Sequence, residues 1–247
     1  RRQRQMCIRD RASRMMAGQF ELWNSIGARE WPPSSVSLTH AHLGHTDGLG
    51  LFGREVMGAS GVIVHCSPSM GDLLNTTPSW SAMIDQGVII PKFWSSMEPF
   101  EPTASCGFTI TAVPVPHRSE LSDNHALIIR GKKKSLLFMP DQDSWSETLE
   151  EGMGILDWLE GMSVDIALID GTFWNYDEIS SRDVSKIPHP TVVETLEMLG
   201  NRRSGDPKIS FFHFNHTNPL LEEGSKECRD LLEMGWGISK QGEVYYL

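Results

Sequence analysis

Three histidines crowd into six residues at the end of an alternating apolar run, and this feature constrains the fold more than any other. His40, His42 and His45 follow residues 36–39, in which apolar and polar side chains alternate as in a strand. Side chains two apart leave a strand on the same side, so His40 and His42 face one point, with His45 on the turn beyond. Neutral imidazole is the commonest zinc ligand and also suits iron. The pattern predicts a metal site, against the alternative of three surface or capping histidines.

Histidine and aspartate recur at the ends of later apolar runs. His117 ends a run that alternates like a strand, and Asp141 follows another such run after a single proline. A carboxylate beside strand-terminal histidines is suited to bridge two cations, because each oxygen can contact one of them. His125 and Asp143 are the competing choices for these two positions. The sequence therefore predicts that metal ligands come from several strand ends.

Composition and charge restrict the class of protein. The chain has 247 residues and a net charge of −10, which opposes nonspecific binding to nucleic acid or anionic lipid. No run approaches the roughly 18 apolar residues that a membrane span needs. The four cysteines form no Cys-x-x-Cys pair, which argues against a disulfide scaffold and weakly favours the cytoplasm. We expect a small-molecule substrate, and the oligomeric state stays open.

The first eleven residues differ in charge from the rest. Residues 1–11 hold five arginines and one aspartate and contain no apolar segment typical of a secretory signal. The string is typical of a translated sequencing adapter, and a basic arm for a partner is the alternative. We expect a non-native or disordered arm over 1–11 and a single domain over 12–247.

Apolar periodicity and breaker residues predict a mixed α/β chain. The expected strands are 61–65, 108–117, 125–130, 135–139, 164–170, 208–213 and 242–247, besides the strand that leads to His40. The expected helices are 13–26, 49–57, 144–159, 190–199 and 222–234, with another beginning at Ser67. Residues 76–107 are rich in Pro, Ser and Trp, and are expected to form an irregular excursion with one short strand at 87–90.

The histidine stretch resembles the His-x-His-x-Asp-His signature of the metallo-β-lactamase superfamily, except that Gly44 stands where the family has Asp. Residues 170–174, Asp-Gly-Thr-Phe-Trp, and the Asn215 to Leu221 segment resemble the coenzyme PQQ synthesis protein B branch. The resemblance implies an α/β, four-layer αββα sandwich. Because such domains usually begin with several strands before the first histidine motif, the first strands are expected to be missing.

The resemblance also implies roles for individual residues. One zinc ion would be held by His40, His42 and His117, and a second, weaker ion by His45, Asp141 and His213. The family's second-ion carboxylate is missing at Gly44, so one or two ions are expected. A histidine before a helix reaches the site of related phosphoesterases, which makes His189 a candidate substrate contact or general acid. Support around the ligands is expected from Asp47, Asp170, His216 and Asn218.

Two enzymatic hypotheses follow, with a binding protein as the third. The leading one is a metal-dependent hydrolase that activates water on one or two zinc ions and cleaves an ester or phosphodiester. The alternative, implied by the PQQ synthesis resemblance, is an iron-dependent oxygenase acting on a tyrosine-derived precursor. A carrier that retains the fold without catalysis is the non-enzymatic possibility.

Overall fold

The computed structural model describes residues 12–13, 15–25, 32–178 and 187–247, so the arm predicted for 1–11 lies outside the described residues. The chain forms two compact units: one comprises residues up to 114 with 119–125 and 244–246, and the other comprises 115–118, 126–243 and 247. The single domain expected over 12–247 stays a prediction.

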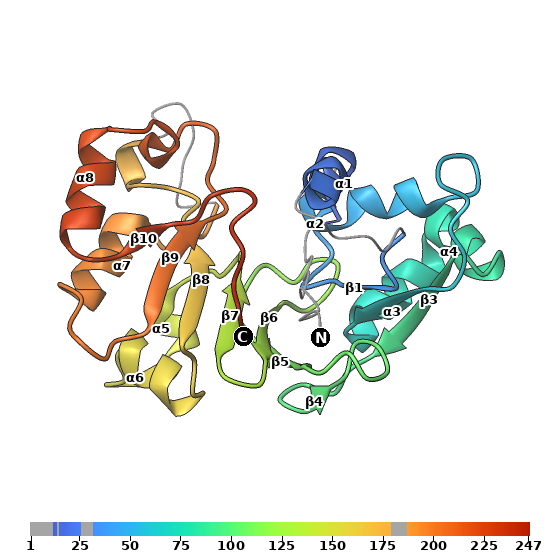
Figure 1. Cartoon of the computed structure of the whole chain (residues 1–247), viewed down its shortest axis with the longest axis horizontal. Helices are drawn as coiled ribbons and strands as arrows, with labels where there is room; N and C mark the ends of the chain where they lie inside the picture. The colour runs from blue at the N-terminus through green and yellow to red at the C-terminus, as the bar shows by residue number, and fades with distance from the viewer. Residues whose placement is uncertain (1–11, 14, 26–31, 179–186) are drawn as a thin grey trace. The chain divides into compact units, whose positions relative to one another are not determined.

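The first unit is built on a parallel three-stranded sheet in the order β1-β2-β3. Its strands are Ser35–Ser37 (β1), Val62–Cys66 (β2) and Ile89–Phe93 (β3). Parallel neighbours need crossover connections, which are usually helical. Here α2 (Leu43–Thr46) and the 3-10 helix η1 (Asp47–Phe52) connect the first two strands, and α3 (Pro68–Thr76) and α4 (Pro78–Asp85) connect the next two (Figure 1).

The core of the first unit includes the predicted N-terminal helix. The helix α1 (Met16–Ser25) buries Met16, Phe20 and Trp23, and the ring of Phe20 lies 6.3 Å from that of Phe52 between centroids. These side chains belong to one apolar cluster with residues of the sheet. The strand end that carries the first histidines is thus attached to a packed core.

The irregular excursion expected over residues 76–107 is wrong. This stretch contains the helix α4, which begins at Pro78, and the strand β3. It also contains the short strand β4 (Pro99–Phe100), which pairs antiparallel with β5 (Thr109–Pro114). Trp80 and Met83 are the buried residues of α4. Because only two of its eight residues are buried, the helix has little apolar periodicity for a sequence pattern to detect.

The second unit holds a sheet in the order β6-β7-β8-β9-β10. Its strands are His125–Arg130 (β6, whose first residue belongs to the first unit), Ser135–Met139 (β7), Ile166–Asp170 (β8), Lys208–Phe212 (β9) and Gly237–Ile238 (β10). The first two form an antiparallel hairpin, and the others add in parallel. All five residues of β8 are buried, which is typical of a strand inside a parallel sheet.

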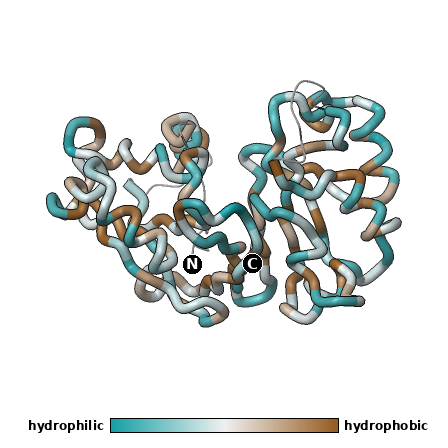
Figure 2. Tube along the Cα trace, turned by 180° about the vertical axis from the view of Figure 1, so that it is seen from behind, coloured by the Kyte–Doolittle hydropathy of each residue, from teal (hydrophilic) through white to brown (hydrophobic). Residues whose placement is uncertain are grey.

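Helices connect the parallel strands of the second unit. They are α5 (Trp145–Thr148), α6 (Ile155–Gly161), α7 (Val192–Leu199) and α8 (Lys226–Glu233), with short 3-10 turns at η2 (Tyr176–Glu178) and η4 (Pro219–Leu221). Figure 2 shows the apolar runs of the chain in brown, separated by polar connections. Some expectations are wrong in detail. The helix over 144–159 is divided into α5 and α6, and the helix over 49–57 is replaced by the 3-10 helix η1 and turns. Residues 242–247 form no strand, so the last strand is β10.

Histidine and aspartate side chains lie at one edge of the second unit's sheet. The strands β7, β8 and β9 are parallel neighbours, with Met139 opposite Ile169 and Asp170 opposite Phe212. Because parallel strands end at the same edge, the residues that follow them lie close together. Asp170 is the last residue of β8, Asp141 follows β7 after Pro140, and His213 directly follows β9.

Candidate metal centre

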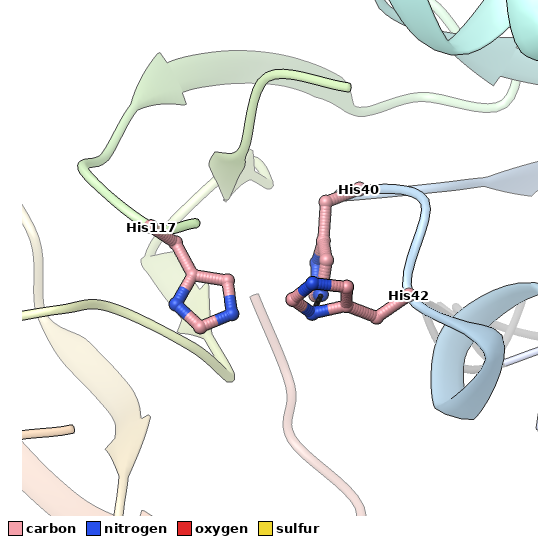
Figure 3. A group of neighbouring side chains, drawn as sticks. All are labelled: His40, His42 and His117. Atoms are coloured by element: carbon pink, nitrogen blue, oxygen red, sulfur yellow. Dashed lines mark hydrogen bonds between the residues drawn. The ribbon is translucent and has the colours of Figure 1, made fainter. Parts of the chain in front are cut away.

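The first unit gathers the three histidines of the signature stretch. His40 lies in the loop after β1, His42 is the residue before α2, and His45 lies within that helix. The Nε2 of His40 and the Nδ1 of His42 are 3.0 Å apart (Figure 3), and the rings of His40 and His45 have centroids 4.2 Å apart. His40 and His45 are buried. Three imidazoles therefore share one small region of this unit.

The outer nitrogens of two of these rings contact oxygen atoms. The Nδ1 of His40 lies 3.1 Å from the Oγ1 of Thr39, and the Nε2 of His42 lies 3.4 Å from the Oε2 of Glu120. The nitrogens that face each other, Nε2 of His40 and Nδ1 of His42, are on the opposite sides of these rings. Such outer partners fix the tautomer and orientation of ligating imidazoles in metal sites.

The position that departs from the family signature is open. Gly44 is exposed in α2, and a Cβ built on it meets no atom within 4 Å. The structure would therefore accommodate a carboxylate side chain here. Asp47, which was expected to support the ligands, is half-buried at the start of η1. Its role stays a prediction.

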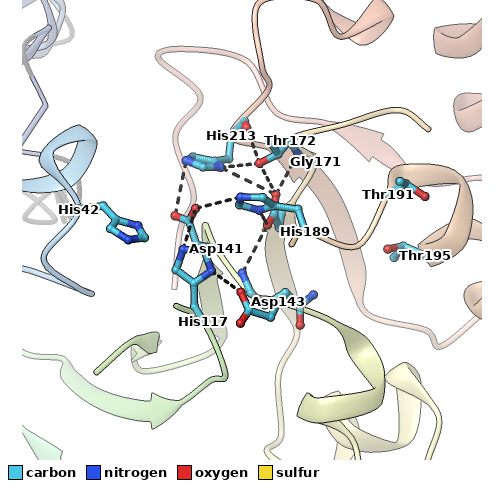
Figure 4. A network of polar contacts seen from close by, with 12 residues as sticks. His42, His117, Asp141, Asp143, Gly171, Thr172, His189, Thr191, Thr195 and His213 are labelled. Atoms are coloured by element: carbon cyan, nitrogen blue, oxygen red, sulfur yellow. Dashed lines mark hydrogen bonds and ion pairs between the residues drawn. The ribbon is translucent and has the colours of Figure 1, made fainter. Parts of the chain in front are cut away.

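The second unit places three imidazoles around one carboxylate (Figure 4). The Nε2 atoms of His117 and His189 lie 3.9 Å and 4.0 Å from the Oδ1 of Asp141, and the Nε2 of His213 lies 3.5 Å from its Oδ2. His117, His189 and Asp141 are buried. Four residues that are remote in sequence thus direct their donor atoms to one place.

Each of these three rings is held on its other nitrogen by an oxygen atom. The contacts are His117 Nδ1 to Asp143 Oδ1 at 2.9 Å, His189 Nδ1 to Asp170 Oδ2 at 2.6 Å, and His213 Nδ1 to Thr172 Oγ1 at 2.9 Å. Thr172 in turn donates from its backbone N–H and its hydroxyl to the Oδ1 of Asp170, at 2.9 Å and 2.7 Å. Asp170 therefore connects the supports of two histidines.

Local backbone geometry brings His213 to the site. His213 directly follows β9 and has a φ of +68°, in the left-handed region that non-glycine residues seldom adopt. The neighbouring Gly171 donates its N–H to the carbonyl of Phe212, and a Cβ at Gly171 would lie only 2.9 Å from that oxygen. The close approach of the two strand ends therefore requires glycine at 171. This close approach brings the hydroxyl of Thr172 to the ring of His213.

His189 is held both by its own backbone neighbours and by charge. Thr191 caps α7, accepting from the N–H of Glu194, and the N–H of Val192 donates to the carbonyl of Phe173. Burial alone would lower the pKa of His189, but the carboxylates of Asp170 and Asp141 outweigh it, and the net pKa is raised above 6.5. In this environment the imidazole retains a proton to higher pH than an exposed histidine.

The donor set of the second unit fits a transition-metal ion. Asp141, Asp170 and His213 each offer a ligand atom within 4.8 Å of the others. Imidazole nitrogens with carboxylate oxygens, each backed by a hydrogen-bonding partner, are suited to zinc and to ferrous iron. The residues present therefore fit a metal cofactor.

The remaining sequence-based candidates occupy different environments. Asn218 is buried and donates from Nδ2 to the carbonyl of Gly171 at 2.7 Å, so it supports the turn after β8. His216 is exposed and lies 3.2 Å from the Oδ1 of Asn215. His125, the competing choice for His117, is buried in the first unit with its Nε2 2.8 Å from the Oγ of Ser96. Of these residues, Asn218 therefore stabilises the loop that follows His213.

Sequence reasoning missed three contacts of the ligand region. The sequence pattern indicates Asp143 only as an alternative to Asp141, and it does not indicate Glu120 or Thr172. Each lies two or three residues from a candidate residue: Asp143 from Asp141, Glu120 from His117 and Thr172 from Asp170. Polar residues at that separation from a strand-terminal ligand are the signal that would have found them.

Comparison with known proteins decides the family. A family model described as the beta-lactamase superfamily domain matches residues 14–220. The chain belongs to this superfamily. Coenzyme PQQ synthesis protein B from Xanthomonas euvesicatoria is 25% identical over 249 residues, covering 90% of this chain and 75% of that protein. The predicted relation to the PQQ synthesis branch of the metallo-β-lactamase superfamily is confirmed.

Solved structures confirm the predicted metallo-β-lactamase fold. Zn(2+)-bound PqqB from Methylobacterium extorquens has a TM-score of 0.72 at 18% identity, over 96% of this chain and 82% of that one. The metallo-beta-lactamase fold protein YhfI from Bacillus subtilis has a TM-score of 0.55 at 16% identity, over 87% and 80%. At these identities the likeness concerns the fold alone.

The superfamily and the metal-binding groups of this chain can be stated together. The chain is a metallo-β-lactamase-superfamily protein related to coenzyme PQQ synthesis protein B, and its histidine and aspartate groups support a metal cofactor. Histidine and aspartate donors suit both zinc and iron. Among the described residues, no helix has the length and apolarity that crossing a bilayer requires.

Proposed function

We propose that this protein is a metal-dependent hydrolase acting on an ester or phosphodiester of a small molecule. The observation that carries the proposal is the convergence of His117, His189 and His213 on the carboxylate of Asp141, with each imidazole held from behind. Structural histidines of a core do not need three such supports around one carboxylate. The arrangement is that of a preorganised ligand set.

The ligand assignment follows the family pattern. His40, His42 and His117 would hold one ion, and His45, Asp141 and His213 a second one. A bound ion would polarise the scissile carbonyl or phosphoryl group and lower the pKa of water from 15.7 toward about 7. Zinc is the proposed metal, because imidazole-rich sites with an open position are typical of catalytic zinc.

His189 is proposed to carry the proton for the leaving group. Its Nδ1 is held by Asp170, so its Nε2, which faces Asp141, is the nitrogen that presents the proton. The raised pKa extends the pH range in which the imidazole carries the proton that a general acid donates. Asp141 also keeps this ring oriented through its charge. A leaving oxygen beside Nε2 would then depart as a neutral alcohol.

The experiment combines metal analysis with turnover. The purified protein should contain between one and two transition-metal ions per chain and cleave a chromogenic phosphodiester or ester such as bis(4-nitrophenyl) phosphate or 4-nitrophenyl acetate. His42→Ala should abolish both metal binding and turnover, while Lys132→Ala, at an exposed lysine in the turn between β6 and β7, should retain both. Full metal content in His42→Ala would contradict the ligand assignment.

A second candidate is supported by the curated relatives, which carry the name coenzyme PQQ synthesis protein B. By analogy, this chain would use ferrous iron to oxygenate a tyrosine-derived precursor, since histidine and carboxylate ligands with open positions also bind ferrous iron. Anaerobic purification separates the two: iron with substrate-dependent oxygen consumption supports the oxygenase, and zinc with ester cleavage supports the hydrolase. Bound metal without either activity would favour a carrier protein.

A further inference from the structure

A carboxylate that the family signature does not contain contacts the second signature histidine. The Oε2 of Glu120 lies 3.4 Å from the Nε2 of His42, although the two residues are 78 positions apart. Both belong to the first unit. We propose that Glu120 is a positioning residue that holds the imidazole of His42 with its Nδ1 directed toward the ion. This inference rests on the metal binding proposed above.

The segment that carries Glu120 is anchored within the first unit, while the Glu120 side chain itself is exposed. In residues 119–125, the carboxylate of Asp123 accepts hydrogen bonds from the hydroxyls of Ser67 and Ser69 at the start of α3, and the N–H of Asp123 donates to the Oγ of Ser69 at 3.1 Å. The backbone N–H of His125 donates to the carbonyl of Thr39 at 3.1 Å. Glu120 therefore lies in a segment that is anchored at two places, at the start of α3 and at the backbone of Thr39 beside His40.

The hydrogen bond between His125 and Thr39 also connects this segment to His40. Thr39, which accepts from His125, places its Oγ1 3.1 Å from the Nδ1 of His40. His125 itself is buried, with its Nε2 2.8 Å from the Oγ of Ser96. One segment thus supports His40 through the backbone and His42 through a carboxylate. A displacement of the segment would disturb both imidazoles together.

The two ring nitrogens of His42 have different partners, and this decides the role of Glu120. The Nδ1 faces the Nε2 of His40 at 3.0 Å, whereas the Nε2 faces Glu120. Two ligands of a tetrahedral zinc ion, each about 2.0–2.1 Å from it, lie about 3.3 Å apart, so the facing pair of nitrogens is close enough to share one ion. Glu120 lies on the opposite side of the ring and acts on His42 rather than on that ion.

The chemistry of a carboxylate behind an imidazole explains the expected effect. A carboxylate accepts the Nε2 proton, which leaves the lone pair of Nδ1 for a cation, and it increases the basicity of the ligand. Asp143 on His117 and Asp170 on His189 provide the same arrangement in the second unit. Since Gly44 lacks the carboxylate of the family signature, Glu120 also supplies negative charge beside His42.

The test measures zinc affinity by competition with a chelator for wild-type protein, Glu120→Gln and Glu120→Ala. We expect Glu120→Ala to weaken the tightest zinc site by about 10- to 100-fold, and Glu120→Gln to weaken it less, because the amide oxygen still accepts a hydrogen bond. Glu98→Ala is the matched control, since Glu98 is an exposed glutamate of the same unit. It should bind zinc as the wild type does.

A second readout separates positioning from general destabilisation. In metal-free protein at pH 8, ¹⁵N NMR of His42 should show mainly the Nε2-protonated tautomer in the wild type and a mixture of tautomers in Glu120→Ala. Asp123→Ala, which releases the anchor on Ser67 and Ser69, should shift the same tautomer balance. Unchanged affinity and an unchanged tautomer in Glu120→Ala would overturn the inference. If the wild type binds no zinc, the proposed function fails instead, and the NMR result still decides the role of Glu120.

Discussion

The Oδ2 of Asp170 lies 2.6 Å from the Nδ1 of His189, and both side chains are buried. A buried imidazole beside a buried carboxylate is a common device for holding a proton at a chosen atom, because the carboxylate fixes the tautomer and favours the charged ring. Here the opposite nitrogen faces Asp141. The pair therefore orients a proton toward the carboxylate on which the three imidazoles converge.

Replacing His189 tests its role as a proton donor. In His189→Asn, turnover should fall by about 10²- to 10⁴-fold, the range expected for loss of a general acid, while the metal content stays unchanged. Steady-state kinetics and metal analysis on the same preparation check this. A variant that loses metal along with activity would instead identify His189 as a ligand. Asp170→Asn should lose activity in the same direction, because it removes the charge that raises the pKa of His189.

Thr172 should matter through its hydroxyl alone. Its Oγ1 donates to Asp170 and also contacts the Nδ1 of His213, so Thr172→Val leaves the buried Asp170 and the half-buried His213 without this partner. We expect metal affinity to fall by about 10- to 100-fold and the free energy of unfolding to fall by about 1–3 kcal/mol. Thr172→Ser keeps the hydroxyl and should resemble the wild type in chelator competition. Equal losses in both variants would contradict a role for the hydroxyl.

Gly44→Asp should restore the carboxylate of the family signature. The space around Gly44 is open, so the aspartate needs no rearrangement of its neighbours. We expect the metal content to rise toward two ions per chain, measured by mass spectrometry after equilibration with zinc. Gly50→Asp, at a second exposed glycine with open surroundings, controls for added negative charge. An equal rise in the control would show that the effect is not specific to position 44.

Acid should destabilise the metal-free protein through two buried histidines outside the ligand groups. Burial lowers the pKa of His65 and of His125 below 6.5. Below pH 6.5 the unfolded chain therefore binds protons that the folded state does not, and the free energy of unfolding decreases by at most about 1.4 kcal/mol per pH unit for each group. Stability is retained above pH 6.5 and lost as the pH falls toward the folded-state values.

The matched variant for this pH effect is His65→Gln. The Nε2 of His65 lies 2.8 Å from the carbonyl of Pro102, and the glutamine amide can donate to the same oxygen without titrating. Urea unfolding between pH 7.5 and 5.5 should show a shallower pH dependence in His65→Gln than in the wild type. An identical slope would mean that His65 does not contribute to it.

Much of the candidate site was predictable because its residues occupy strand ends. Asp141 and His213 follow apolar strands that pair in parallel with β8, so their proximity follows from sheet topology. The contact of Glu120 with His42 was not predictable, since it depends on how a loop folds back across a long sequence separation. The helix α4 was missed for a different reason, because so little of its surface is buried.

The left-handed backbone at His213 restricts which residues can take its place. Outside glycine, asparagine and aspartate are, with histidine itself, the residues that most readily adopt positive φ. Of these only aspartate and histidine are strong ligands for a transition metal. If position 213 were randomised and selected for metal binding, the survivors should therefore be aspartate and histidine, whereas glutamate and cysteine, although capable ligands elsewhere, should be depleted.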